Sequence, residues 1–178
     1  RWASMTPEER LDTWTPIPGW GPPHSHPLDR AVSLIPELRA ERLEEIGIDF
    51  SVLYPSSALI FPHIEDAELR QTICRALNIV NAEVFGPYKD RMTPAFAIPM
   101  MNPDEAIAEV EFAVKELGLK VGMFGSVPRP IPAIHREHPE LYRSAYRFDT
   151  FGIDSPYDYD PFWAKCEELK VPLVSHGT

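Results

Sequence analysis

The stretch Asp160–Thr178 reads DPFWAKCEELKVPLVSHGT. Asp160 at a capping position and Pro161 at the first helical position predict a short helix, followed by a tight turn and a buried strand over residues 171–175. The inward face of this helix is expected to carry Phe162, Cys166 and Leu169. His176 stands where the strand ends. Because parallel α/β folds hold ligands and metals at the carboxyl ends of their strands, His176 is a candidate ligand or base.

Three further strand segments precede this unit, and helical segments separate them. The predicted elements are a helix over 36–46, a strand over 48–54, a helix over 65–85, a strand over 93–99, a helix capped by Asn102, and a strand over 119–124. The strand over 48–54 is apolar enough to be buried on both faces. The long helix is expected to bury an apolar stripe made of Leu69, Ile73, Ala76, Leu77, Val80 and Val84.

Two segments show no sustained hydrophobic periodicity of the helical or the strand kind. Residues 1–27 are broken by proline and glycine, and Trp2, Trp14 and Trp20 suggest that this irregular segment packs on the rest of the chain or on a partner. Residues 125–159 are predicted to form a long irregular loop on the catalytic face, since they follow the end of a strand. The whole chain, residues 1–178, is expected to form a single domain that includes both segments.

Helices alternating with apolar strands predict an α/β fold with a parallel sheet. Two architectures fit this alternation: a doubly wound sheet, and part of a (β/α)8 TIM barrel, which needs about 250 residues when complete. No glycine-rich fingerprint links a strand to a following helix, which disfavours mononucleotide binding of the Rossmann or P-loop kind.

The composition narrows the classes of partner. The chain has 178 residues, a formal net charge of −10, 44% apolar residues and 25% charged residues, as expected for a globular protein with one sizeable core. The acidic balance argues against a nucleic-acid partner or an anionic membrane surface, and no apolar run approaches the roughly 18 residues of a spanning helix. Cys74 and Cys166 fall in helical patterns and predict buried free thiols in a reducing, cytoplasmic compartment.

Four segments form a pattern in their order and spacing. They are EEIGID at 44–49, CRALN at 74–78, PDEA at 103–106 with ELG at 116–118, and DPFW at 160–163 running into ELKVPLVSH at 168–176. Together they resemble the amidohydrolase-related family of the amidohydrolase superfamily, the branch with aminocarboxymuconate-semialdehyde decarboxylase and many metal-dependent hydrolases. The resemblance covers roughly residues 40–178.

The resemblance implies a (β/α)8 barrel with a divalent metal, usually zinc, at the carboxyl ends of the strands. Family members take two ligands from a His-x-His on the first strand, a histidine from the fifth and an aspartate from the eighth. His176 matches the fifth-strand histidine, and a neutral imidazole suits zinc. No first strand with His-x-His precedes the first helix, and the sixth-strand histidine and eighth-strand aspartate have no counterparts. We therefore expect a partial sequence that supplies about strands two to five.

His24-Ser25-His26 is the one His-x-His present, and it is discounted as a metal site. Pro22, Pro23 and Pro27 flank it and disfavour a central strand. A loop ahead of the first helix fits these residues better.

The loop over 125–159 carries a cluster of mostly cationic side chains that could receive an anionic substrate group. Its members are Arg129, His135, Arg136, His138, Arg143, Tyr146 and Arg147. Arg129, nearest the strand end, and His135 are candidate substrate contacts. The alternative is a solvated loop with salt bridges to Glu137, Glu140 and Asp149.

Three other residues stand near predicted strand ends. Ser56 and Met100 follow the second and third barrel strands and are expected to line the pocket or to pack. Lys120 is rejected as a metal-bridging lysine because it stands at the amino end of its strand.

The resemblance therefore predicts a metal-dependent hydrolase, most simply a zinc enzyme, that acts through a metal-activated water on a small, carboxylate-bearing substrate. The alternative is a nonoxidative decarboxylase on the same metal site. A second alternative is a non-catalytic partial barrel. Its open strand edges would lead to aggregation, to pairing with another copy in a homo-oligomer, or to a need for the missing strands.

Overall fold

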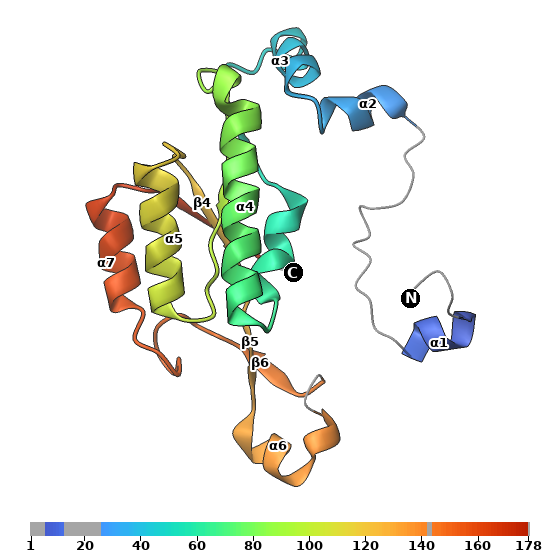
Figure 1. The fold of residues 1–178 in the computed structure, drawn as a ribbon, viewed down its shortest axis with the longest axis vertical. Helices are drawn as coiled ribbons and strands as arrows, with labels where there is room; N and C mark the ends of the chain where they lie inside the picture. The colour runs from blue at the N-terminus through green and yellow to red at the C-terminus, as the bar shows by residue number, and fades with distance from the viewer. Residues whose placement is uncertain (1–5, 13–25, 142–143, 178) are drawn as a thin grey trace.

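A computed structural model describes residues 6–12, 26–141 and 144–177 of the chain (Figure 1). Trp2, Trp14, Trp20, His24 and Arg143 lie outside these residues. The described N-terminal residues form three helices: α1 (Pro7–Asp12), α2 (Pro27–Val32) and α3 (Pro36–Glu45). Helix α1 is a departure from the irregular segment that the sequence predicts. Acidic Glu8 and Glu9 in its first turn favour a helix there despite the neighbouring prolines.

The centre of the structure is a set of parallel strands. They are β1 (Ser51–Leu53), β2 (Met92–Pro94), β3 (Phe96–Ala97), β4 (Gly122–Gly125) and β7 (Leu173–His176). Strand β1 pairs with β2, β3 pairs with β4, and β4 pairs with β7, all in parallel. Ala95 joins β2 to β3, and its N–H donates to Leu53 O at 2.8 Å. Residues 92–97 therefore act as one strand between β1 and β4, and the strands lie side by side in chain order.

Three helices lie side by side along the sheet (Figure 1): α4 (Ala67–Phe85), α5 (Pro103–Lys115) and α7 (Asp160–Glu168). Alternate strand residues divide the packing between two faces. Phe96, Ile98 and Phe124 belong to a cluster with α5 and α7. Ala97, Met123 and their neighbours instead form a second cluster with the 3₁₀ turns η2 (Ser56–Leu59) and η3 (Phe61–His63) and with Cys74 and Leu77 of α4. Parallel strands in chain order, with helices on one side, form an open α/β segment with no closed barrel among the described residues.

The caps of α5 confirm the sequence prediction. The Asn102 side chain accepts the Glu105 N–H at 2.9 Å, and Pro103 opens the helix. The chain leaves the end of this helix through Gly118, whose φ of +67° lies in the left-handed region that glycine tolerates. In α7 the prediction is wrong in one detail. Tyr159, not Asp160, is the N-cap residue, and the Asp160 N–H instead bonds the Asp158 side chain at 2.9 Å.

The apolar stripe predicted on α4 is largely exposed. Leu69 is 52% exposed and Val80 53%, whereas Arg70, Cys74 and Asn78 are the buried residues of the helix. The reason is the strand edge that α4 covers. Strand β1 ends opposite Pro94, so it does not pair with Ala97 further along the neighbouring strand. The Asn78 side chain instead bonds both the N–H and the C=O of Ala97, at 2.8 and 3.0 Å. Satisfying this buried backbone edge turns the polar side of the helix inward.

Two other predictions need correction. The strand predicted over 48–54 is shorter, and Phe50 and Tyr54 beside it are 44% and 50% exposed, because β1 pairs on one edge only among the described residues. The loop over 125–159 is not irregular. Strands β5 (Pro128–Pro130) and β6 (Tyr146–Phe148) form an antiparallel hairpin, with α6 (Pro132–Glu137) and the 3₁₀ turn η5 (Pro139–Leu141) at its tip (Figure 1).

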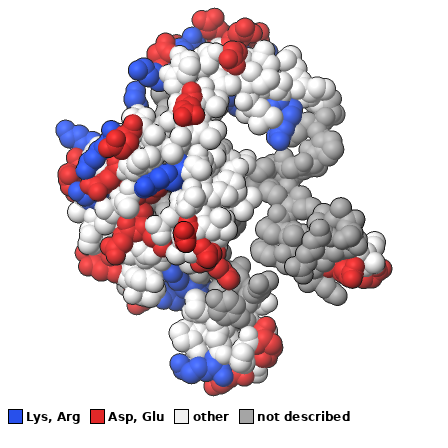
Figure 2. All heavy atoms as spheres, in the orientation of Figure 1, with Lys and Arg blue, Asp and Glu red and all other residues white. Residues whose placement is uncertain are grey.

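Charge and burial agree with the composition in two respects. On the face drawn in Figure 2, lysine and arginine side chains of the described residues are interspersed with acidic ones and do not form a single basic patch. Both cysteines are free and buried, Cys74 on α4 and Cys166 on α7, as the sequence predicts.

No helix in the described ranges is long and apolar enough to cross a membrane.

Candidate metal and substrate site

His176 ends strand β7 at the carboxyl edge of the sheet, where the sequence places it. It is exposed and stands opposite Gly125 of β4 in the parallel register. Its Nδ1 lies 2.8 Å from Gly177 O. When Nδ1 carries the proton and donates to this carbonyl, Nε2 keeps its lone pair, which is the tautomer that a metal ligand needs. A rigid strand end and a neutral imidazole therefore fit one ligand of a divalent metal.

A second histidine, which the sequence interpretation missed, lies at the same edge. His63 ends the turn η3, which follows β1, and both of its ring nitrogens are buried with no hydrogen-bond partner among the described residues. A Cβ added at Gly125 would lie 3.2 Å from His63 Nε2 and 3.5 Å from His176 O. Burial lowers the pKa of His63, so the neutral imidazole is favoured. The only signal in the sequence is a histidine in the segment after a strand.

A catalytic metal site would require more ligands than His63 and His176 supply. Within the described ranges, no group of three histidine, cysteine, aspartate or glutamate side chains could hold a metal ion. The described His26 lies exposed ahead of α2, and its side chain makes no capping bond. A catalytic zinc normally has three protein ligands, so His176 fits as one member of a set that the described residues do not complete.

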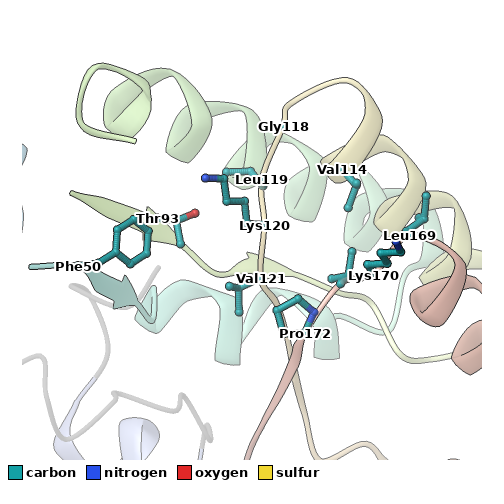
Figure 3. A pocket seen from close by; sticks show the side chains of 11 residues that line it. Phe50, Thr93, Val114, Gly118, Leu119, Lys120, Val121, Leu169, Lys170 and Pro172 are labelled. Atoms are coloured by element: carbon teal, nitrogen blue, oxygen red, sulfur yellow. The ribbon is translucent and has the colours of Figure 1, made fainter. Parts of the chain in front are cut away.

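A cavity of about 480 Å³ opens at the opposite end of the strands (Figure 3). Thr93, Val121 and Pro172 line it, together with Lys120 and Lys170, near the amino ends of β2, β4 and β7. In α/β barrels the amino face serves stability and the carboxyl face carries the chemistry. This cavity therefore does not mark the candidate site, and Lys120 lies at the amino end, as the sequence predicts.

The predicted substrate contacts near strand ends differ in placement. Ser56 opens η2 after β1 and is exposed. Met100 is 1% exposed and packs in the cluster with α5 and α7, which corresponds to the packing alternative. Its carbonyl accepts a hydrogen bond from Tyr159 Oη at 2.7 Å. Contact of Ser56 with a substrate stays a prediction.

Arg129 on β5 joins the hairpin to the body of the protein. Its Nε donates to Asp149 Oδ2 at 2.6 Å, and Nη2 donates to Met101 O at 2.8 Å and to Tyr159 Oη at 3.1 Å. The guanidinium also lies over the Tyr157 ring, 5.1 Å from its centroid. These bonds commit Arg129 to anchoring the hairpin, and its predicted contact with a substrate stays untested.

Three other described cationic residues of this segment, His135, His138 and Arg147, contact neighbours within residues 125–159. His135 lies on α6 at the tip, where its Nε2 contacts Ala145 O at 2.7 Å (Figure 1). His138 is exposed and lies 3.1 Å from Glu140, as the salt-bridge alternative expected. Arg147 donates to Asp154 O at 2.5 Å. His135 as a substrate contact therefore stays a prediction that its position at the tip does not support.

The Arg129–Asp149 pair predicts a loss of stability in acid. Burial raises the pKa of Asp149, but hydrogen bonds from Phe151 N–H, Arg129 and Ser155 outweigh it and hold the pKa below its ordinary value. A carboxyl with a depressed folded-state pKa stabilises the fold above its unfolded value of about 3.9, and this contribution is lost as pH falls through the folded-state pKa. In urea unfolding, wild type should therefore have a larger free energy of unfolding than Asp149→Asn at pH 6, and this difference should be smaller at pH 3. A gap of equal size at both pH values would contradict this account.

Comparisons with known proteins identify the family of this chain. The amidohydrolase family model matches residues 22–178. A γ-resorcylate decarboxylase from Rhodococcus jostii (strain RHA1) is 27% identical over 172 residues, which is 96% of this chain and 47% of that protein. The chain thus spans less than half the length of the curated relatives it matches.

Two solved structures share the fold. One is a dihydroxybenzoic acid decarboxylase from Polaromonas sp. JS666 with bound manganese and the inhibitor 2-nitroresorcinol, with a TM-score of 0.60 and 25% identity over 79% of this chain and 37% of that one. The other is 2,6-dihydroxybenzoate decarboxylase from Rhizobium, with a TM-score of 0.59 and 26% identity over 78% and 38%. The family match covers most of the chain, and so the chain belongs to the amidohydrolase family.

Proposed function

We propose that the protein containing this chain is a metal-dependent decarboxylase of a hydroxylated aromatic carboxylate. The observation that carries this proposal is the likeness to proteins named as decarboxylases of γ-resorcylate and of dihydroxybenzoate, in sequence and in fold. It supports the decarboxylase alternative over the hydrolase that the sequence reading put first. γ-Resorcylate is 2,6-dihydroxybenzoate, so these relatives point to one substrate class.

The reaction breaks the bond between the ring carbon and the carboxyl group. The carboxyl group leaves as carbon dioxide, and a proton takes its place on the ring carbon, so that 2,6-dihydroxybenzoate would give resorcinol. A bound divalent metal would supply positive charge that orients the anionic substrate. His176 would hold that metal through Nε2, and manganese in the Polaromonas structure supports manganese as a candidate beside zinc.

The test is an assay of the full-length natural protein that contains this chain. With 2,6-dihydroxybenzoate we expect resorcinol and carbon dioxide in equal amounts, measured by liquid chromatography and by gas release. Treatment with EDTA should abolish the activity, and added Mn²⁺ or Zn²⁺ should restore it, which also identifies the preferred metal. Absence of resorcinol together with metal-dependent hydrolysis of an ester, lactone or amide would overturn the decarboxylase proposal in favour of the hydrolase.

A further inference from the structure

The position of His63 is fixed by a buried arginine. Arg70 on α4 donates from Nη1 to Ile64 O at 2.5 Å and to Glu65 O at 3.0 Å, directly after the turn that carries His63. The same guanidinium bonds Glu105 of α5. These contacts, with the buried Pro62, hold the backbone on both sides of His63, and no hydrogen bond among the described residues holds the imidazole itself. His63 therefore has a fixed backbone position and a ring that can turn towards a ligand.

No hydrogen bond among the described residues gives the His63 imidazole a structural role. Both nitrogens are buried, and neither has a partner within the described residues. A buried polar group without a partner costs about 1–3 kcal/mol, and most such groups in native proteins are satisfied. An apolar side chain of similar size would avoid this cost. A histidine held here at a cost to stability is typical of a group that serves a ligand.

The imidazole also lies on the face of the sheet that His176 shares. Gly125 and His176 are register partners on neighbouring parallel strands, so their Cβ directions lead to the same face. The Cβ direction of Gly125 leads to His63 Nε2, and the absence of a side chain there admits the ring. His63 and His176 thus lie at one strand end, on the face away from α5 and α7.

We propose that His63 is a substrate-binding residue whose Nε2 hydrogen-bonds an oxygen of the aromatic carboxylate held beside His176. A neutral imidazole offers one donor and one acceptor, and a carboxylate next to a ring hydroxyl offers the complementary pair. This subsite rests on the proposed function. It adds a recognition element from the segment after β1 to the metal ligand at the end of β7.

The test measures binding of 2,6-dihydroxybenzoate by calorimetry to the full-length protein and three variants. His63→Leu should bind about 10- to 100-fold more weakly, as expected for loss of a hydrogen bond to a charged group. Its melting temperature should equal or exceed that of wild type, and its metal content should be unchanged. His63→Gln, whose amide nitrogen can occupy the place of Nε2, should recover part of the affinity. The matched control His138→Leu removes an exposed histidine of the hairpin and should bind like wild type.

The outcomes separate the subsite from the reaction. Equal affinity of wild type and His63→Leu, or weaker binding accompanied by unfolding or loss of metal, would overturn the role of His63. Tight binding to wild type without resorcinol formation would contradict decarboxylation and leave the subsite standing. Failure of wild type to bind 2,6-dihydroxybenzoate at all would overturn both proposals.

Discussion

Replacing Glu105 by alanine should lower the free energy of unfolding by about 3–5 kcal/mol, because it leaves the charge of Arg70 buried without a partner. The two side chains form a bidentate pair, with Nε to Oε2 at 2.8 Å and Nη2 to Oε1 at 2.6 Å, and are only 4% and 8% exposed. Glu105 also accepts a hydrogen bond from Asn102 at 2.7 Å, so the helix cap weakens with it. Urea unfolding followed by circular dichroism measures the change.

Two further variants test whether the loss of stability comes from the buried Arg70–Glu105 pair. Glu111→Ala, on the same helix, removes a half-buried surface glutamate that pairs with Lys115 and Lys165, and should leave the unfolding midpoint nearly unchanged. The double variant Arg70→Met, Glu105→Leu removes both charges and should be less destabilised than Glu105→Ala. If Glu105→Ala unfolds no more easily than Glu111→Ala, the pair does not hold α4 to α5.

The second large effect concerns the metal. His176→Ala in the full-length protein should lower metal affinity by more than about 100-fold, since loss of outer-shell partners alone costs about 10- to 100-fold. His176 is exposed, and the one side-chain hydrogen bond described for it is to Gly177 O, so the fold should keep its melting temperature. Metal content after dialysis, measured by mass spectrometry, gives the result.

A histidine outside the proposed site provides the control. His26→Ala removes an exposed residue ahead of α2 and should leave the metal content at the wild-type level. Loss of metal in His26→Ala would return the His24–His26 pair to consideration as a ligand source. Full metal content in His176→Ala would remove His176 from the ligand set.

The sequence predicted those elements that local signals determine. Asn102, Pro103 and Gly118 bound α5 where expected, and the strand that ends at His176 lies parallel to β4. Caps, prolines and glycines act within a few residues, so their effect can be predicted without the fold. The same holds for the candidate metal ligand, whose role depends on a strand end and a family resemblance.

Contacts between distant segments could not be predicted in this way. Asn78 turns inward because of the edge of a strand that lies 19 residues further along the chain. His63 gains its place from the absence of a side chain at Gly125 on another strand. The hairpin of β5 and β6 depends on a pairing across a turn-rich segment with no hydrophobic alternation. In each case the deciding partner is remote in sequence, and local periodicity carries no information about it.

The two buried cysteines allow local opening of the helices to be followed by alkylation of their thiols. Burial raises the pKa of Cys74 to about 12, with Glu109 adding to the effect, and raises the pKa of Cys166 to about 11. Alkylating reagents attack the thiolate, which neither residue forms to a useful extent near neutral pH while the helices are packed. Modification of Cys74 therefore registers separation of α4 from the sheet, and modification of Cys166 registers separation of α7. The alkylation rates of Cys74 and Cys166 therefore report how often α4 and α7 separate from the sheet.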